Sequence, residues 1–498
     1  MGKKGAPYNA VVIMVDQMRA TASHLWGNPD CRTPNLEKLS RKGVLYSNAF
    51  TPHPLCVPAR VSLWSSQYTH THGGRRNETF MPPETLHAFE VWKQLGYTTG
   101  LIGKNHCFME PGDLDLFDVW CEITHRGFED RFPVKGMEWF RPEGKIEEAH
   151  SVRQNMPKVN PVFSYAFTEF PLEDYSTGLI TGQTVRFLET NRDRPFALWV
   201  SYPDPHMPYE APVSYASQFN AESLRIPEWR ENEEQGAPER NRVLKKLLGV
   251  EDYPLEDLKR FMVAYYAMIR FIDDGVGRIM EALEAFDLHR NTVVVFCSDH
   301  GDFAGEHGMV SKGGAFYDSM TRIPLIFCDP GRSAAGQIEE SMVNLIDIVP
   351  TLFRLQGQDL PRSFQGRPLP GITDEPPREY AFSEYGAGGP AFTMDHLAKL
   401  PGPYGRAAVK ESLQWREAEG RRKMVRSRKW KYVHDPCGDR DELYDLTVDP
   451  NEHFNVADRP EHREVLRELQ RELLDWSIRT EGGTAPTPLP DPDKYRMG

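Results

Sequence analysis

Cysteine is scarce in this chain of 498 residues, and its copies are scattered without any paired spacing. An odd and sparse set of this kind argues against a disulfide framework and against a cysteine-based zinc motif. The fold therefore has to depend on a hydrophobic core. The seven cysteines are Cys31, Cys56, Cys107, Cys121, Cys297, Cys328 and Cys437.

The chain also lacks an apolar run long enough to cross a membrane as a helix. The apolar run Ala10–Val15 is too short for a signal peptide and ends at Asp16, so we interpret it as the first core strand. We therefore expect a soluble, cytoplasmic protein with no membrane partner.

The chain has no excess of basic residues either. The chain has 59 Lys and Arg against 72 Asp and Glu, a formal net charge of -13. This balance argues against nucleic acid or an anionic membrane surface as the main partner. An anion-binding pocket would have to be a local concentration of positive charge. Hydrophobic residues at 39% and charged residues at 26% are typical of a globular protein with a sizeable core.

Buried strands alternate with helices along most of the chain. Val11–Val15 and Thr292–Phe296 are continuous apolar runs rich in β-branched residues, which are typical of strands buried on both faces. An amphipathic pattern over Leu258–Phe286 predicts a long helix, and Thr33 before Pro34 predicts the start of another. The alternation predicts an α/β fold with a mostly parallel, doubly wound sheet. Further strands are predicted at Val44–Phe50, Thr98–Ile102, Phe196–Ser201 and Pro324–Phe327.

The pattern changes after the proline-rich stretch 373–378, where shorter, antiparallel strands are expected. A helix over Glu461–Trp476 follows them. These strands are predicted at Tyr380–Glu384, Trp430–His434 and Glu442–Leu446. We therefore divide the chain into three parts. Residues 1–375 form a large α/β domain, and 376–480 form a smaller C-terminal subdomain with an antiparallel sheet and a helix. Residues 481–498 form a proline-rich extended tail.

Two segments interrupt the alternation. His125–Tyr165 is rich in turn residues and aromatics, and Glu228–Lys246 is highly charged. We interpret both as insertions over the rim of the sheet, where loops commonly select the substrate.

Two of the predicted strands end in metal-binding residue types. Asp16 and Gln17 follow the first strand, and Asp299 and His300 follow the strand at 292–296. Function collects beyond the carboxyl ends of strands in an open α/β sheet. If the two strands are neighbours, these four side chains can converge on one divalent cation. A set dominated by oxygen suits Ca²⁺, Mg²⁺ or Mn²⁺ better than Zn²⁺.

A short motif, Cys56-Val57-Pro58-Ala59-Arg60, is predicted at the entrance to a helix. Pro58 lacks a backbone N–H that the first helical turn would leave unpaired in any case. The Cys56 side chain is therefore expected near a helix N-terminus, with the Arg60 guanidinium one turn further on. Such an environment favours anions. Four further cationic or imidazole residues follow strands or occupy loops: Lys104, His106, His206 and Lys312.

Taken together, these motifs resemble the sulfatase family of the alkaline-phosphatase superfamily, in particular its branch of arylsulfatases, choline sulfatases and phosphonate monoester hydrolases. The resemblance extends from Asn9 to Leu446. Each of the five blocks alone is weak evidence for the family, whereas the whole set in this order is specific for it. The blocks are Val15-Asp16-Gln17, Cys56-x-Pro58-x-Arg60, Gly103-Lys104-x-His106, Pro205-His206-x-Pro208, and Ser298-Asp299-His300-Gly301 with Lys312.

The resemblance implies an alkaline-phosphatase-like fold in which residues 1–375 form the catalytic domain. It implies that Cys56 is converted to formylglycine, whose hydrate attacks sulfur with one oxygen and expels sulfate by collapsing through the other. It also implies that His206 is the general acid that protonates the leaving oxygen and that Asn77 contacts the substrate. The resemblance further implies that the hydrate is bound, and charge balanced, by Arg60, Lys104, His106 and Lys312. The implied substrate-binding residues are Lys104, His206 and Lys312. The implied ligands of one Ca²⁺ or Mn²⁺ ion are Asp16, Gln17, Cys56, Asp299 and His300.

The implied partners are a small alkyl or aryl sulfate ester and a maturation enzyme that generates formylglycine. Relatives that assemble, together with the proline-rich tail, suggest a homo-oligomer, either a dimer or a tetramer.

Alternatives stay open at this point. Gln17 replaces a second aspartate that many sulfatases carry, and it recurs in the branch that contains phosphonate monoester hydrolases. A phosphonate monoester or phosphodiester hydrolase with the same nucleophile is therefore the main alternative. The Gly103-Lys104-x-His106 block, which those hydrolases lack, favours sulfate esters. A degenerate scaffold or binding module would be expected to lose one of the ligands or charges, and none is missing.

Overall fold

The computed structural model describes residues 8–109, 111–125, 127–128, 134–138, 148, 151, 164–227, 229, 233, 236–330, 336–402, 404 and 406–481. Most of the predicted insertion at His125–Tyr165, and the predicted tail after Glu481, lie outside these residues. No helix within the described ranges is long and apolar enough to cross a lipid bilayer.

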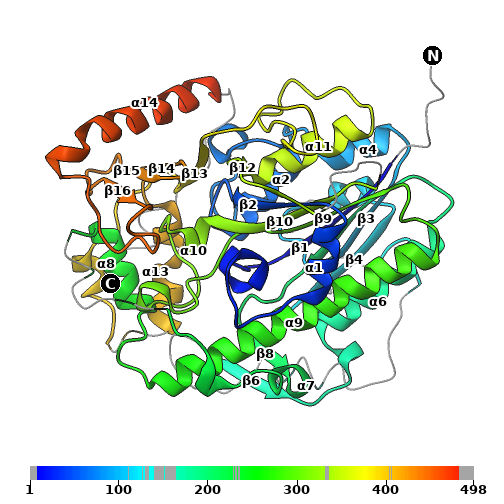
Figure 1. The fold of residues 1–498 in the computed structure, drawn as a ribbon, viewed down its shortest axis with the longest axis horizontal. Helices are drawn as coiled ribbons and strands as arrows, with labels where there is room; N and C mark the ends of the chain where they lie inside the picture. The colour runs from blue at the N-terminus through cyan, green and yellow to red at the C-terminus, as the bar shows by residue number, and fades with distance from the viewer. Residues whose placement is uncertain are drawn as a thin grey trace.

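A ten-stranded sheet lies at the centre of the described chain (Figure 1). Its strands are β1 (Asn9–Val15), β2 (Val44–Phe50), β3 (Thr98–Gly103), β4 (Val119–Thr124), β5 (Gly127–Phe128), β7 (Phe196–Tyr202), β9 (Thr292–Ser298), β10 (Arg322–Cys328), β11 (Gln337–Glu339) and β12 (Val343–Asn344). They are arranged in the order β11-β2-β10-β9-β1-β7-β3-β4-β5, and β12 also pairs with β2. The run from β9 to β4 is parallel, while β10 is antiparallel to both β9 and β2. The predicted α/β class with a mostly parallel sheet is confirmed.

Helices cover both faces of this sheet (Figure 1). One face carries α1 (Pro34–Arg41), α6 (Ser176–Thr190) and α9 (Leu255–Ala285), and the other carries α2 (Cys56–Ser65), α4 (Ala88–Gln94) and α11 (Ile348–Leu355). Successive side chains of a strand point to opposite faces, so a central strand has to be apolar throughout. In β1 the alternation is complete, because one core contains Val11, Ile13 and Val15 and the other contains Ala10, Val12 and Met14.

The C-terminal part contains the antiparallel sheet and the helix that the sequence predicts. Four strands, β13 (Ala381–Tyr385), β14 (Arg422–Arg426), β15 (Trp430–His434) and β16 (Glu442–Asp445), pair in sequence order. Helix α14 (Arg463–Arg479) packs on them through Leu469, Leu473 and Trp476. The division at 375 and 480 stays a prediction.

The described C-terminal portion of the charged segment 228–246 begins helix α8 (Glu239–Leu248), which packs on two neighbours. One is the loop that follows β9, where the Val310 N–H donates to the Leu248 oxygen at 3.1 Å and Met309 lies in the same hydrophobic cluster as Leu244. The other is the C-terminal part, where the buried Arg240 guanidinium pairs with Asp435 at 2.7 Å and with Glu442 of β16. The interpretation of this segment as an insertion over the rim of the sheet stays a prediction.

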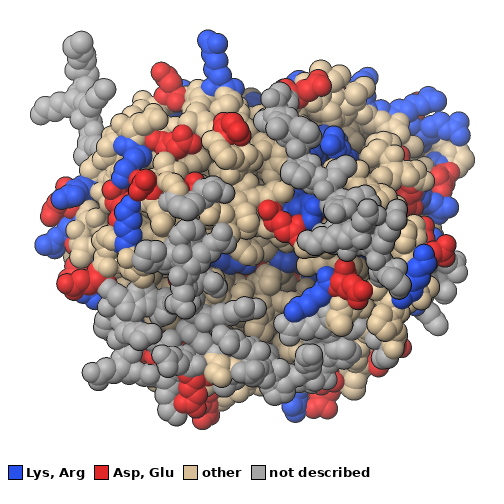
Figure 2. Space-filling model, turned by 180° about the vertical axis from the view of Figure 1, so that it is seen from behind, with Lys and Arg blue, Asp and Glu red and all other residues tan. Residues whose placement is uncertain are grey.

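The remaining described elements are short or peripheral. Strands β6 (Tyr165–Thr168) and β8 (Tyr209–Pro212) form a two-stranded parallel sheet. The other α-helices are α3 (Thr69–His72), α7 (Val213–Ala216), α10 (Asp318–Thr321), α12 (Met394–Leu397) and α13 (Arg406–Ala418). On the face in Figure 2, the described acidic and basic side chains are interspersed, so the net negative charge does not gather in one patch there.

Candidate active site

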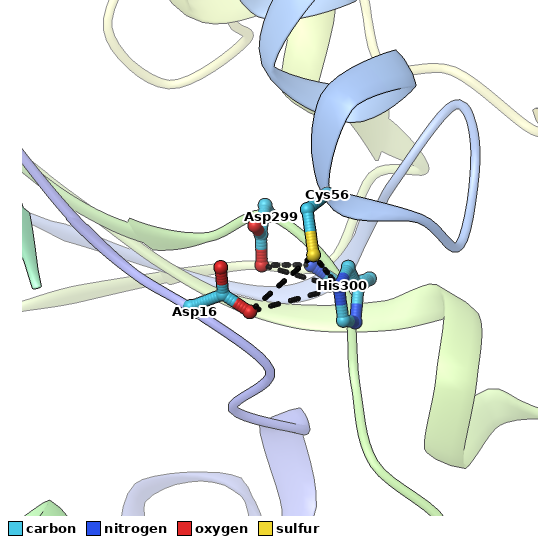
Figure 3. A group of neighbouring side chains, drawn as sticks. All are labelled: Asp16, Cys56, Asp299 and His300. Carbon is cyan, nitrogen blue, oxygen red and sulfur yellow. Dashed lines mark hydrogen bonds and ion pairs between the residues drawn. The ribbon is translucent and has the colours of Figure 1, made fainter. Parts of the chain in front are cut away.

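The candidate site lies where β1 and β9 end side by side. The two strands pair in parallel up to their last residues, so Asp16 and Asp299, which follow, leave the sheet at the same edge. Cys56 and His300 complete a cluster whose four ligating atoms all lie within 4.8 Å of one another (Figure 3). All four residues are buried. The two acid-tipped strands are therefore neighbours, as the sequence analysis required.

Cys56 is the first residue of α2, with Leu55 as the N-cap. Its sulfur lies 2.7 Å from Nζ of Lys312 and 3.2 Å from Nε2 of His300. Pro58 is the third residue of the helix, within the turn whose backbone N–H groups have no intrahelical partner. The sulfur is thus at the positive end of a helix and in contact with basic side chains.

Arg60, one turn further along α2, joins the two aspartates. Its Nε donates to Asp299 at 3.0 Å and its Nη2 donates to Asp16 at 2.9 Å, and all three side chains are fully buried. Its Nη1 donates to Oγ of Ser201 at 2.8 Å and to the backbone oxygen of Lys104 at 3.0 Å. The guanidinium is therefore engaged in fixing the two acids relative to each other. The sequence analysis did not identify Ser201, the second-last residue of β7.

The other predicted cations surround the same cluster. Nζ of Lys104 donates to Asp16 at 2.6 Å, and this lysine is buried. Nζ of Lys312 contacts Cys56, and it also lies 3.0 Å from Nε2 of His206. His106 is exposed, and its imidazole interacts with the Cys56 thiol.

Positive charge outweighs burial at the thiol. Burial disfavours the thiolate, but Lys312 and Lys104 hold the pKa of Cys56 well below its usual value. Burial also disfavours the Asp16 carboxylate, yet basic neighbours including Lys104 bring the pKa of Asp16 below its usual range. In contrast, burial and the adjacent Asp16 charge raise the pKa of Asp299. A further cation between the two carboxylates would reduce their repulsion.

The Gln17 side chain tests whether these residues fit a metal ion. Its Nε2 donates to Asp302 at 2.5 Å and to the Tyr209 hydroxyl at 3.3 Å, which fixes the orientation of the amide. The opposite atom, Oε1, is buried and has no hydrogen-bond partner in the described structure. An orphaned carbonyl oxygen, from the residue next to Asp16, together with two carboxylates and an imidazole is a ligand set that suits an oxygen-preferring divalent cation. The residues present therefore fit the metal that the sequence predicts.

Asp302 and Tyr209, which orient Gln17, were not selected from the sequence. The Tyr209 hydroxyl donates to Asp302 at 2.6 Å, so the carboxylate accepts from both residues. The sequence could have indicated Asp302 as a site residue, because it follows Asp299 by only three positions. Nothing in the sequence indicates Tyr209, since a tyrosine in a proline-rich loop carries no specific pattern.

His206 lies beside Lys312 in a loop with three prolines. Its Nδ1 is 2.6 Å from the backbone oxygen of Met207, and its ring centroid is 4.9 Å from that of His125. Desolvation and the neighbouring Lys312 charge lower the pKa of His206 to about 3. In this arrangement Nδ1–H of His206 donates to the Met207 oxygen, and the Lys312 ammonium donates to Nε2 of the neutral imidazole.

Asn77 lies close to Cys56, and both ends of its side-chain amide are engaged. Its Oδ1 accepts from the backbone N–H of Val57 at 3.2 Å, in the first turn of α2. Its Nδ2 donates to Oε1 of Glu417 at 2.7 Å, and its backbone N–H donates to Oε2 at 3.1 Å. Asn77 thus connects the helix that carries Cys56 to the C-terminal part of the chain. The sequence analysis missed Glu417, because one acid in a charged stretch has no distinguishing pattern.

Replacing Glu417 by glutamine is expected to change how stability depends on pH. Burial raises the pKa of Glu417 to about 7, so the native state binds this proton more tightly than the unfolded chain does. The wild-type protein therefore loses stability as Glu417 loses its proton between about pH 4.5 and about pH 7. Glutamine does not titrate, so the stability of Glu417→Gln relative to wild type should increase by about 3 kcal/mol across this range.

Urea unfolding at about pH 5 and about pH 8 measures this difference. Burial raises the pKa of Glu452 to about 7 as well, but this residue is common to both proteins and its contribution cancels. A stability difference that is the same at the two pH values would contradict the prediction.

Comparisons with known proteins agree with this geometry. A family model described as Sulfatase matches residues 8–357, well over half of the chain. The chain is 26% identical to the multifunctional alkaline phosphatase superfamily protein PehA of Trinickia caryophylli, over 94% of this chain and 95% of that protein. It is also 26% identical to an arylsulfatase of Clostridium perfringens, over 96% of each chain. The crystal structure of a phosphonate monoester hydrolase of Agrobacterium radiobacter superposes with a TM-score of 0.75 at 25% identity, covering 95% of this chain and 96% of that one.

Proposed function

The chain belongs to the sulfatase family of the alkaline phosphatase superfamily, and from this premise we propose that it hydrolyses a small alkyl or aryl sulfate ester. The observation that carries the proposal is the convergence of Cys56, two buried aspartates and two lysines at one edge of the sheet. Such a site combines a nucleophile position with a local concentration of positive charge inside an acidic protein. It suits a tetrahedral anionic ester.

The proposed nucleophile is Cys56 after conversion to formylglycine. Its sulfur marks the position that the aldehyde hydrate would occupy, beside Lys312 and His300. The hydrate supplies one oxygen that attacks sulfur as the alcohol leaves, and a second oxygen whose deprotonation regenerates the aldehyde and releases sulfate. The intact mass of the peptide spanning Cys56 distinguishes thiol from aldehyde directly, and an unmodified thiol in fully active protein would contradict the assignment.

Asp16, Gln17, Asp299 and His300 would bind one divalent cation, Ca²⁺ or Mn²⁺. The support is the donor set, which is dominated by oxygen and includes the orphaned Oε1 of Gln17. Such a cation would lower the pKa of the attacking hydroxyl and neutralise charge on the transferring group. Arg60 keeps the two aspartates in place around it, through bonds of 3.0 and 2.9 Å.

Lys104 and Lys312 are proposed to bind the transferring group, together with His106 at the exposed side. Each lysine already contacts an anionic group of the cluster, Asp16 or Cys56. Their charges favour a transition state in which negative charge spreads over the non-bridging oxygens. Asn77 is proposed to contact the substrate as well as the first turn of α2.

We expect His206→Ala to slow esters with poor leaving groups far more than activated aryl esters. Nε2 of His206 lies 3.0 Å from the Lys312 ammonium, so this nitrogen can take a proton from the lysine and give it to the leaving oxygen, while Nδ1 stays bound to the Met207 oxygen. For an alkyl sulfate we expect a loss of about 10²-fold to 10⁴-fold. An activated aryl sulfate needs little protonation and should lose much less. The ratio of kcat/KM for the two substrates is the measurement, and equal losses would remove the general-acid role.

A second candidate is a phosphonate monoester or phosphodiester hydrolase with the same nucleophile. It is favoured by the similarity to the phosphonate monoester hydrolase of Agrobacterium radiobacter and to the multifunctional protein of Trinickia caryophylli. Relative turnover of an aryl sulfate and a phenyl phosphonate ester separates the two functions. We expect the sulfate to be preferred, and a strong preference for the phosphonate would reverse the ranking.

Several wider features belong to the same proposal. A formylglycine-generating enzyme would act on Cys56 during maturation, and the assembly would be a homodimer or homotetramer in the cytoplasm. Residues 1–375 would form the catalytic domain and 376–480 the C-terminal subdomain. Mass spectrometry of the native protein measures the assembly.

A further inference from the structure

A second group of metal-ligand side chains lies outside the candidate active site. Oε1 of Glu233 is 2.7 Å from Nδ1 of His453 and is also hydrogen-bonded to Nδ1 of His307. The three ligating atoms all lie within 4.8 Å of one another. The two histidines are buried and Glu233 is half-buried. The proposed hydrolysis uses none of the three residues, which come from distant parts of the sequence.

The His307 imidazole is fixed by its surroundings. It stacks on the ring of Tyr317, with centroids 3.7 Å apart and an interplanar angle of 19°. The Tyr317 hydroxyl in turn accepts from Asn241 of α8 at 3.0 Å. The His307 backbone is left-handed, with φ of 53°, a conformation that is uncommon for a residue other than glycine. Strained backbone of this kind concentrates at functional sites and ligand clamps.

The Glu233 carboxylate contacts both imidazoles through one oxygen. Within the described ranges, the ion pairs of Glu233 are with His307 and His453. A divalent cation at this point would accept lone pairs from both nitrogens and from the carboxylate, and would replace these two contacts.

The chemistry of the ligands selects the metal. Two imidazole nitrogens and one carboxylate oxygen form a set that zinc prefers, and one that differs from the oxygen-dominated set of Asp16, Gln17 and Asp299. We propose that Glu233, His307 and His453 bind a zinc ion, with water in the fourth position, and that this second site connects two distant parts of the chain. It goes beyond the proposed hydrolysis and does not depend on it.

The role follows from where His307 lies. Residues 303–311 form a narrow loop, because Phe303 N–H donates to the Ser311 oxygen at 3.0 Å and Gly305 N–H donates to the Met309 oxygen at 2.8 Å. His307 is at the tip of this loop, and Lys312 immediately follows its base. Zinc would therefore connect the tip to His453 in the C-terminal part and restrict the movement of the segment that carries Lys312.

The test is zinc uptake by the full-length chain. Protein treated with a chelator is given Zn²⁺ alone, passed through a desalting column and analysed for zinc per chain by mass spectrometry. Wild type is expected to retain about one zinc ion per chain that Glu233→Gln and His453→Ala lose. Added zinc should also raise the thermal unfolding temperature of wild type more than that of the two variants, which keep only the Asp16 and Asp299 cluster.

Two features of the design keep the result interpretable. Glu233→Gln is nearly isosteric, so it preserves the fold while removing the charge, and both variants leave the Asp16 and Asp299 cluster unchanged. The matched control is His434→Ala, an exposed histidine of β15 in the same part of the chain, which should bind zinc like wild type. Equal zinc content in wild type and both variants overturns the proposal, and so does wild type that takes up no zinc.

Discussion

Replacing Cys56 by alanine is expected to abolish turnover of every sulfate ester while leaving the fold intact. The substitution removes the sulfur atom that Lys312 and His300 contact at the proposed nucleophile position. Removal of a nucleophile in other hydrolases lowers kcat by several orders of magnitude, so we expect a loss of about 10⁴-fold or more. Alanine is compatible with the first turn of α2, so thermal unfolding should remain cooperative. The measurements are kcat/KM with an aryl sulfate and a thermal melt.

Cys107→Ala is the matched control for this experiment. Cys107 is also fully buried, but it packs in the hydrophobic core, where burial raises the pKa of its thiol. Its substitution should cost some stability and leave turnover close to wild type. Activity of Cys56→Ala within about tenfold of wild type would refute the nucleophile assignment.

Asp299→Asn is expected to lose most of the bound divalent metal, and turnover with it. The Asp299 carboxylate accepts from the backbone N–H of Gln17 at 3.0 Å and from Arg60 at 3.0 Å. An asparagine amide has one oxygen instead of two, so it must turn its NH₂ group toward one of these donors. The substitution also removes one of the two carboxylates that attract the cation. Metal affinity should fall by at least about tenfold to 100-fold, the range seen when only a residue that supports a metal ligand is lost.

Metal content per chain, measured after dialysis against a defined metal concentration, tests this prediction. Asp395→Asn is the control, because Asp395 is exposed at the start of α12 and should not change the metal content. Unchanged metal in Asp299→Asn would mean that the ion binds elsewhere.

Continuous apolar runs identify the strands that are buried on both faces, but they do not fix where those strands end. β1 and β9 are buried throughout and extend the predicted runs by two residues at one end. β2 and β15 contain half-buried or exposed residues and have the predicted bounds. β4 was missed, since Glu122 and Thr124 are only half-buried and break its run. Helices α8 and α13 were missed because they are rich in charges, some of which are buried in ion pairs.

The site could be predicted where its residues follow strand ends or form compact motifs. Asp16, Cys56 and Asp299 belong to such blocks, and the structure brings them together. Their supporting partners could not be predicted, because Ser201 and Glu417 are ordinary residues that reach the site from segments distant in the sequence. Long-range pairing of this kind is set by the tertiary fold and leaves no local periodicity.

The contacts between the C-terminal part and the active-site side have a consequence for chimaeras. Glu384 of β13 pairs with His70 at 2.8 Å and with Arg75 at 3.4 Å, and Glu417 binds Asn77. If the C-terminal half came from a relative without an acid at the position of Glu384, the buried Arg75 would lose its counter-ion, a change that is costly inside a protein. Recombination between homologues therefore has to transfer the residues on both sides of this boundary as one inherited unit.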